Sequence, residues 1–312
     1  LRACHILVDE KIAHPLLLGV EGDIQVKAAE LGVSLQGVEI VDPATSLWRR
    51  PYVYELYRIR QRRGVTLSEA RELINNHNYF ASMMVRMGDA DALVSGVTQH
   101  FPDTIRPALQ VVQVHDGTHK VSGCYVMITR KGDLMFLADC SVNIEPTAED
   151  LAEIALCTAN AARRFDVEPK VAMLSFSNFG STRHPQVKKV RRATQLVKQA
   201  DPYLIVDGEM MADIAVTPEL LERDYPFSTL HGGANVLIFP DLDSANIAYK
   251  LLARIGGAET LGPMLMGMKK PVHLLPRGAD VDDVVKIATI AVVDAQESAA
   301  EPAWAGELVA AE

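Results

Sequence analysis

The sequence predicts an α/β protein of two domains whose sheets are mainly parallel. Short apolar runs that end in Gly, Ser, Asp or Pro alternate with amphipathic stretches along almost the whole chain, which is the pattern of strands and helices in such a fold. One segment departs from this alternation and is typical of a β-hairpin. The length of 312 residues also exceeds the size at which a single hydrophobic core stops growing.

Five apolar runs are expected to form strands that enter loops. They are residues 14–19, 91–96, 170–177, 203–209 and 235–241. A helix is expected over about residues 148–165, because Thr147 and Asp150 have the spacing of a capping box and apolar residues at helical spacing follow them.

The predicted hairpin covers residues 121–142, where two β-rich runs meet at Lys131-Gly132-Asp133. A glycine between two polar residues is typical of a tight turn joining antiparallel strands. We expect this hairpin to open the second domain.

The composition excludes several classes of protein. The net charge of −9 argues against a general nucleic-acid binder, which needs a broad basic face. Four cysteines without CxxC spacing, and no signal peptide or apolar span of membrane length, predict a cytoplasmic protein that binds no membrane. The sequence has no GxGxxG, GxxxxGK[ST], HExxH or GxSxG motif.

The chain begins at Leu1 within what reads as a helix. An α/β domain usually places a strand before its first helix. We therefore expect the sequence to be a piece of a longer polypeptide, with a strand ahead of this helix.

Basic residues gather in the segment WRRPYVYELYRIRQRRG, which contains Arg58, Arg60 and Arg62. In a helix over 52–63, Arg58 and Arg62 share a face and Arg60 points elsewhere. A solvated helix explains any single arginine of this segment as well as a ligand site does.

A strand, a loop and a helix beginning near Asp103 or Thr104 are expected within residues 87–112. The hydroxyl of Ser95, the helix start and the guanidinium of Arg106 could together hold a phosphate or a carboxylate. A simple cap at Thr104 and a surface charge at Arg106 explain the same residues.

Two further segments carry polar side chains. The loop SFSNFGSTRHP contains Ser175 and Ser177, which suit phosphoryl contacts or an ordinary turn. The acidic groups in DGEMMAD and DLDSAN lack the glycine and distal glutamate of a calcium loop, so we predict no metal site.

Five segments together resemble the phosphate acetyltransferase family, in order and over nearly the full length. They are NYFASMMVRMGDADALVSGVTQHFPDTIRPALQVV, SFSNFGSTRHPQVKKVRRA, DGEMMADIAV, GANVLIFPDLDSANIAYKLL and LGPMLMGMKKPVHLLPRGADVDDVV. The sequences of several of these segments are most similar to the acetyltransferase-like C-terminal region of bacterial hybrid, NADP-dependent malic enzymes.

The resemblance implies an isocitrate/isopropylmalate dehydrogenase-like fold. Its first domain would join residues 1–117 with 263–312, and residues 118–262 would form an inserted domain that supplies the dimer contact. The family's catalytic arginines carry over to Arg60 and Arg106, and the arginine and aspartate of its terminal motif carry over to Arg277 and Asp283. The implied acetyl-CoA or phosphate contacts are Arg60, Ser95, Thr104, Arg106, Ser175, Ser177, Asn235, Arg277 and Asp283.

The motif LPRGADVDD departs from the family's pattern, because Pro276 and Ala279 replace its serine and cysteine. Proline has no hydroxyl to donate to a developing oxyanion, and losing one such donor costs on the order of 10²–10³ in rate. We therefore expect no catalytic residues here.

The leading hypothesis is an acetyl-CoA-binding regulatory module of a hybrid malic enzyme. Its missing N-terminal domain, the expected partner in the same chain, would oxidise malate with NADP and Mg or Mn. The alternatives are an active phosphate acetyltransferase and a structural oligomerisation domain. In each case a homo-oligomer, a dimer or higher, is expected.

Overall fold

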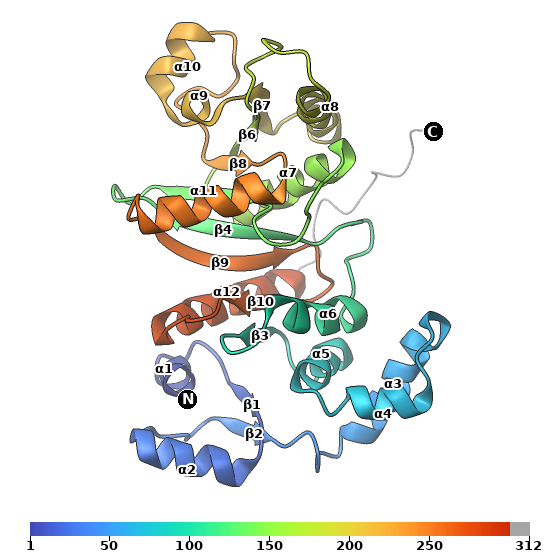
Figure 1. Ribbon diagram of the computed structural model, residues 1–312. Coiled ribbons are helices and arrows are strands. Elements are labelled where there is room, and N and C mark those ends of the chain that lie inside the picture. The colour runs from blue at the N-terminus through green and yellow to red at the C-terminus, as the bar shows by residue number, and fades with distance from the viewer. Residues whose placement is uncertain (300–312) are drawn as a thin grey trace. The chain divides into compact units, whose positions relative to one another are not determined.

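The computed structural model describes residues 1–299 (Figure 1). These residues form two compact units, and the first of them joins both ends of the described chain. Unit 1 comprises Leu1–His115 and the described residues from Met268 onward, and unit 2 comprises Asp116–Gly267. The predicted domain bounds at 117/118 and 262/263 lie near these limits, and the functional assignment of the domains stays a prediction.

Unit 1 has two pairs of parallel strands. Strand β1 (Leu16–Leu18) pairs with β2 (Glu39–Val41), and β3 (Leu93–Gly96) pairs with β10 (Val272–Leu275). Its helices are α1 (Arg2–Asp9), α2 (Glu21–Leu31), α3 (Arg49–Arg60), α4 (Leu67–Leu73), α5 (His77–Met87), α6 (Phe101–Val111) and α12 (Val281–Ala299), with a short 3₁₀ helix η1 (Gln61–Arg63).

The core of unit 1 is built on the inner faces of α3 and α5. Tyr52, Leu56, Phe80 and Met83 have at most 1% of their surface exposed. Tyr52 and Phe80 pack edge to face, with ring centroids 5.1 Å apart, an arrangement that the aromatic quadrupoles favour. This packing fixes α3, which carries Arg60 at its end, against α5.

Unit 2 has a mixed sheet in the order β9-β4-β5-β8-β6-β7. Its strands are β4 (Ser122–Ile128), β5 (Leu134–Ala138), β6 (Lys170–Leu174), β7 (Ile205–Met210), β8 (Val236–Ile238) and β9 (Glu259–Met266). Its helices are α7 (Ala148–Arg163), α8 (Pro185–Ala200), α9 (Ala212–Val216), α10 (Pro218–Asp224) and α11 (Leu242–Arg254).

Side chains on β5 alternate between the two faces of this sheet, as strand geometry requires. Leu137 packs in one core with Ala245 of α11, whereas Phe136 meets Phe165, at the end of α7, with ring centroids 5.5 Å apart. The sheet is therefore buried on both sides, which explains why its strands read as nearly continuous apolar runs.

Two local predictions are confirmed. Helix α7 begins with the capping box of Thr147 and Asp150, and β4 and β5 form the predicted antiparallel hairpin. Helix α6 begins at Phe101, ahead of the expected start near Asp103, because Pro102 occupies its first turn. Proline is favoured there because the first turn needs no intrahelical N–H donor.

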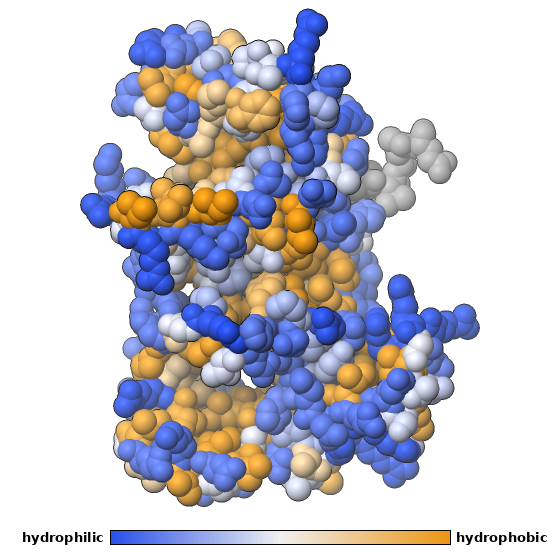
Figure 2. All heavy atoms as spheres, viewed as in Figure 1, coloured by the Kyte–Doolittle hydropathy of each residue, from blue (hydrophilic) through white to orange (hydrophobic). Residues whose placement is uncertain are grey.

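Helix α11 carries an exposed apolar stripe on the surface of unit 2 (Figure 2). Ile247, Leu251 and Ile255, four residues apart, are 58%, 52% and 77% exposed. Residues at this spacing share one helix face.

Candidate active site

The carboxyl ends of β3 and β10 lie side by side in unit 1. The strands are parallel, and their register places Ser95 opposite Leu274 and Gly96 opposite Leu275. A Cβ atom on Gly96 would lie only 2.2 Å from the carbonyl oxygen of Leu275, and Gly96 has a φ of +125°. Only glycine permits this approach, so the loops that follow both strands leave from one point.

A hydrogen-bond network holds the loop after β3. The Ser95 hydroxyl donates to Asn78 Oδ1 over 2.7 Å, and the Asn78 amide donates to Gln99 Oε1. Arg277, in the loop after β10, donates from Nε to the Gln99 carbonyl oxygen over 3.4 Å. Both loops are thus tied to buried Asn78 of α5, and Ser95 and Arg277 belong to one connected site.

Arg60 and Arg106 come together at a second point of unit 1, around Tyr79. Burial raises the pKa of the Tyr79 hydroxyl, and the positive charges of Arg60 and Arg106 partly offset that rise. The hydroxyl donates to Gln110 Oε1 over 2.6 Å. Residues from α3, α5 and α6 therefore build one positively charged cluster.

One side-chain nitrogen of Arg60 in this cluster lacks a hydrogen-bond partner among the described residues. This atom, Nε, is buried. A buried donor without a partner is rare and often marks the place of an ion or a ligand. Arg106 is exposed on α6, so the cluster is open to an anion.

The loop after β10 presents a charged side chain to solvent. Pro276, Arg277 and Gly278 are all exposed, and the Ala279 amide donates to the Pro276 carbonyl oxygen over 3.2 Å. Gly278 has a φ of +82°, which glycine adopts without strain. This tight turn fixes Arg277 beside the end of β3.

Asp283 has a structural role at the start of α12. Its carboxylate accepts the Asp280 amide over 3.0 Å, and the Asp280 side chain accepts the Asp283 amide over 2.9 Å. This reciprocal pairing is a capping box. The Asp-x-x-Asp spacing was visible in the sequence, although only the structure shows both bonds.

Thr104 is not available to a ligand. Its side chain is 2% exposed and donates to the His100 carbonyl oxygen over 3.3 Å within α6. A first-turn threonine often satisfies its own helix in this way.

The other candidate residues lie in unit 2 and are not brought to one place. Ser175 and Ser177 follow the carboxyl end of β6, where buried Ser177 accepts the Thr182 amide. Asn235 precedes β8 and accepts the Lys170 amide over 2.7 Å, at the amino end of β6. Because these strands are parallel, the length of β6 separates Asn235 from the two serines.

Glu209 is a buried residue that the sequence analysis considered only as a metal ligand. Its carboxylate accepts the Gly180 amide over 2.6 Å and receives two hydrogen bonds from Arg191. Burial raises its pKa, but the Arg191 guanidinium and backbone amides outweigh that effect, so the pKa is lowered from 4.5. Glu209 therefore anchors the loop of Ser175 and Ser177.

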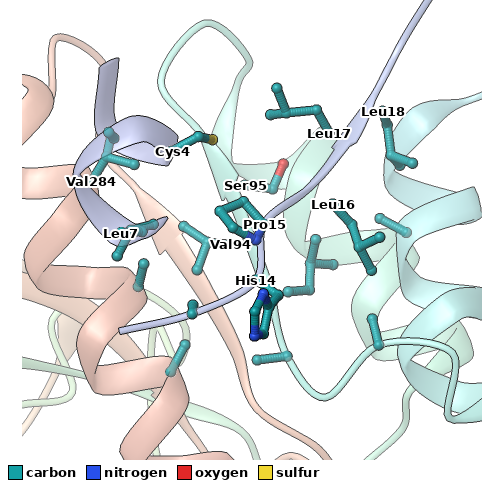
Figure 3. Close-up of a pocket in the computed structure, with 18 of the residues that line it drawn as sticks. Cys4, Leu7, His14, Pro15, Leu16, Leu17, Leu18, Val94, Ser95 and Val284 are labelled. Carbon is teal, nitrogen blue, oxygen red and sulfur yellow. The ribbon is translucent and has the colours of Figure 1, made fainter. Parts of the chain in front are cut away.

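A cavity of about 1530 Å³ lies within unit 1 (Figure 3). Residues of α1, β1, β3, α5 and α12 line it, and apolar side chains predominate. Ser95 and Ala279 border one part of it, whereas Arg60, Arg106 and Arg277 do not line it. The arginine cluster and the cavity are thus separate features.

Residues 1–299 contain no group of three His, Cys, Asp or Glu side chains placed to hold a metal ion. Within the same residues, no helix combines the length and the apolar character needed to cross a membrane.

The structure is that of a two-unit α/β protein in which Arg60 and Arg106 form one positively charged cluster and Arg277 stands in the loop after β10. The profile of the family described as "Phosphate acetyl/butaryl transferase" matches residues 1–292. The chain belongs to this family.

Individual relatives agree with that assignment. A phosphate acetyltransferase of Bacillus subtilis is 41% identical, over 95% of this chain and 91% of its own length. One from Thermoanaerobacterium thermosaccharolyticum is 42% identical, over 95% and 92%. The crystal structure of a phosphotransacetylase from Streptococcus pyogenes superposes with a TM-score of 0.91 at 39% identity, covering 95% of this chain and 90% of that one.

The leading hypothesis from the sequence is therefore wrong. Relatives matched over about nine tenths of their length are phosphate acetyltransferases, which are acyltransferases. They support neither a regulatory module of a malic enzyme nor an NADP-dependent malate oxidoreductase. The hypothesis gave too much weight to Pro276, which removes one hydroxyl donor but leaves three arginines in place. The expected NADP and Mg or Mn concern residues outside this sequence, and no comparison tests them.

Proposed function

We propose that this protein is an active phosphate acetyltransferase that exchanges an acetyl group between coenzyme A and inorganic phosphate. The observation that carries the proposal is the similarity of nearly the whole chain to enzymes of that name, at 40–42% identity. Acetyl-CoA and phosphate, both anionic, suit a site of local positive charge on a protein with a net charge of −9.

Arg60 and Arg106 are the proposed phosphate ligands. A phosphate oxygen would give the buried Nε of Arg60 the partner that the protein does not supply. Guanidinium groups bind phosphate with two parallel hydrogen bonds, which fixes both its position and its orientation. Ser95 and Arg277 are further proposed ligands of the anionic substrates, and Ser175 stays a prediction.

The proposed reaction is a direct acyl transfer. A phosphate oxygen attacks the carbonyl carbon of the thioester, and the carbonyl oxygen takes up negative charge. The C–S bond then breaks, leaving acetyl phosphate and the thiolate of coenzyme A, which takes a proton from solvent or a nearby acid. Arginine charges assist by orienting phosphate and by stabilising the developing negative charge.

The absence of a hydroxyl at Pro276 is compatible with this chemistry. Arg277, the next residue, is exposed in a tight turn and carries a charged donor. Donors that carry a full charge form stronger hydrogen bonds than neutral hydroxyls do. Arg277 is the proposed stabiliser of the carbonyl oxygen, and the serine of the family motif is dispensable.

The direct test is acetyl phosphate formation by the purified protein from acetyl-CoA and phosphate. Release of the coenzyme A thiol is followed with a chromogenic disulfide, and acetyl phosphate is trapped as its hydroxamate. The Arg60→Gln variant is the matched negative control. Turnover that requires both substrates and falls in the variant supports the proposal, whereas thiol release without acetyl phosphate would contradict it.

The proposed assembly is a homodimer through the apolar stripe of α11. Ile247, Leu251 and Ile255 expose a continuous helix face on unit 2, and such faces mark interaction surfaces. A two-fold axis would pair the stripe with its own copy. Four free cysteines also favour the reducing environment of the cytoplasm.

A further inference from the structure

The Ser95 hydroxyl, at the carboxyl end of β3, has a fixed direction. Its oxygen lies 2.7 Å from Oδ1 of Asn78, to which the hydroxyl donates. A hydroxyl group has one hydrogen to donate and two lone pairs that accept. Because the hydrogen is committed to Asn78, Ser95 can meet a ligand only as a hydrogen-bond acceptor.

The orientation of the Asn78 amide decides this direction. Its Nδ2 atom lies 3.5 Å from the backbone carbonyl oxygen of Asp103, in the first turn of α6. That carbonyl would ordinarily accept the amide four residues later in the helix, but Pro107 stands there and has no N–H group. A carbonyl oxygen can only accept, so it takes the nitrogen end of the Asn78 amide. The oxygen end is thereby turned toward Ser95.

Asn78 is also prevented from reversing its amide. The residue is 4% exposed, and Nδ2 donates to Gln99 Oε1 as well as to the Asp103 carbonyl oxygen. Reversal would break the bond to Ser95 and place the amide oxygen against that carbonyl. Leaving buried polar groups without partners in this way is costly.

Cations lie on both elements that are tied to Asn78. Arg277 donates from Nε to the Gln99 carbonyl oxygen over 3.4 Å, and a guanidinium group has four further N–H donors. Helix α6 carries Arg106 three residues after Asp103. Ser95 is only half-buried, so a ligand can reach it. This part of unit 1 therefore offers charged donors together with one acceptor.

Hydrogen phosphate has the groups that this combination requires. At neutral pH it carries ionised oxygens, which accept from arginine, and at least one P–OH group, which donates. Sulfate has a similar shape and charge but no proton. A site that presents an acceptor disfavours an anion without a donor, because lone pairs then face lone pairs and the acceptor stays without a partner.

We propose that Ser95, held as an acceptor by Asn78, selects hydrogen phosphate through its P–OH group. This inference rests on the proposed function, in which phosphate is a substrate, and adds the two residues that distinguish it from anions without a proton. The bond would also orient phosphate, with its P–OH group toward Ser95 and its ionised oxygens toward the arginines and the thioester. Ser95 is thus a specificity-determining residue, and Asn78 is a positioning residue.

Binding of two anions by the full chain tests the proposal without turnover. Isothermal titration calorimetry at pH 8 compares hydrogen phosphate with monofluorophosphate. Both are mainly dianions of similar size at this pH, but fluorine replaces the hydroxyl of the second anion and cannot donate. Phosphate should bind about 10- to 100-fold more tightly, as expected when one acceptor loses its donor.

Two variants separate the roles of the pair. Ser95→Ala removes the acceptor, so the two anions should bind with nearly equal affinity. Asn78→Ala frees the Ser95 hydroxyl to donate, so monofluorophosphate should bind more tightly than it does to the natural protein. Ser82→Ala is the matched control and should keep the natural preference. Ser82 is a fully buried serine of the same helix, and its hydroxyl has no partner among the described residues.

Failure of this inference can be distinguished from failure of the proposed function. If the natural protein binds both anions equally, or if Ser95→Ala keeps the preference, the specificity role is wrong although phosphate still binds. No gain for monofluorophosphate in an Asn78→Ala variant that is folded by circular dichroism would overturn the positioning role. If phosphate does not bind at all, the proposed phosphate site is wrong and this inference is wrong with it.

Discussion

The Tyr79 hydroxyl donates a 2.6 Å hydrogen bond to Gln110 Oε1, and this bond joins α5 to α6 beside Arg60 and Arg106. The bond leaves the lone pairs of the phenol oxygen in the field of two guanidinium groups. Tyr79 therefore helps to hold the arginine cluster without carrying charge itself.

The first prediction concerns this tyrosine. Tyr79→Phe removes the hydroxyl and leaves Gln110 Oε1 without its donor, so kcat/KM for phosphate should fall by about threefold to tenfold. Steady-state kinetics at varied phosphate measures the effect. Tyr54→Phe is the matched control, because Tyr54 is 49% exposed. Equal behaviour of the two variants would remove Tyr79 from the site.

Arg60 and Arg106 should be the principal phosphate ligands. Replacing either one by glutamine removes a charged hydrogen bond, so kcat/KM for phosphate should fall by about 10- to 100-fold. Arg58→Gln serves as the control, since Arg58 is exposed and pairs with Glu55 at 2.6 Å. If Arg58→Gln reduces activity as much as Arg60→Gln, general charge rather than a defined site is responsible.

Residues 276 and 277 should differ in importance. Pro276→Ser restores a hydroxyl where Arg277 already supplies a charged donor, so kcat should change by less than about threefold, whereas Arg277→Ala should lower it by about 100-fold. Turnover numbers for both variants decide the point. Activity that appears only in the serine variant would contradict the proposed function.

Two substitutions of Asp283 distinguish a catalytic role of its charge from its role in capping α12. Asp283→Asn keeps an oxygen acceptor for the Asp280 amide and removes the charge, whereas Asp283→Ala removes both. Loss of the cap should cost about 1 kcal/mol of stability in the alanine variant, measured by urea unfolding. Loss of activity in the asparagine variant at unchanged stability would assign Asp283 a role in proton transfer, and full activity would limit it to capping.

Stability in acid should depend on Glu209. Because its pKa is lowered in the folded protein, its contribution is present above the ordinary value of 4.5 and is lost as the pH falls below it. Glu209→Gln should therefore be less stable than the natural protein at pH 7, and the difference should narrow as the pH falls below 4.5. Urea unfolding at pH 7 and at a series of lower pH values tests this, with exposed Glu30→Gln as the control. A constant difference across this range would contradict the assignment.

Much of the fold could be predicted because its signals are local. The Thr147 capping box and the Lys131-Gly132-Asp133 turn specify α7 and the β4–β5 hairpin within a few residues. Strand β2, by contrast, has only three residues, Glu39–Val41. A run of three residues is too short to show the alternation of apolar and polar residues that identifies a strand. Its pairing with β1 depends on contacts between residues distant in the sequence.

The site could be predicted only in part. The resemblance to the family suggested Arg60 and Arg277, and the pattern of residues 87–112 also suggested Arg106. The side-chain direction of Thr104 and the position of Asn235 at the amino end of a strand depend on the folded chain. Tyr79 and Gln110 gave no signal, since an aromatic and an amide within helices are typical of ordinary packing.

The close backbone contact between Gly96 and Leu275 restricts how segments of this protein can be exchanged with those of its relatives. A chimera that takes only one of the two neighbouring loops from a relative would pack that loop against a second loop from this protein, and the two would not have evolved to fit each other. Segments 97–100 and 276–280 should therefore be exchanged as a single block, although more than 170 positions separate them in the chain. A library that draws these segments from different parents should contain few functional members.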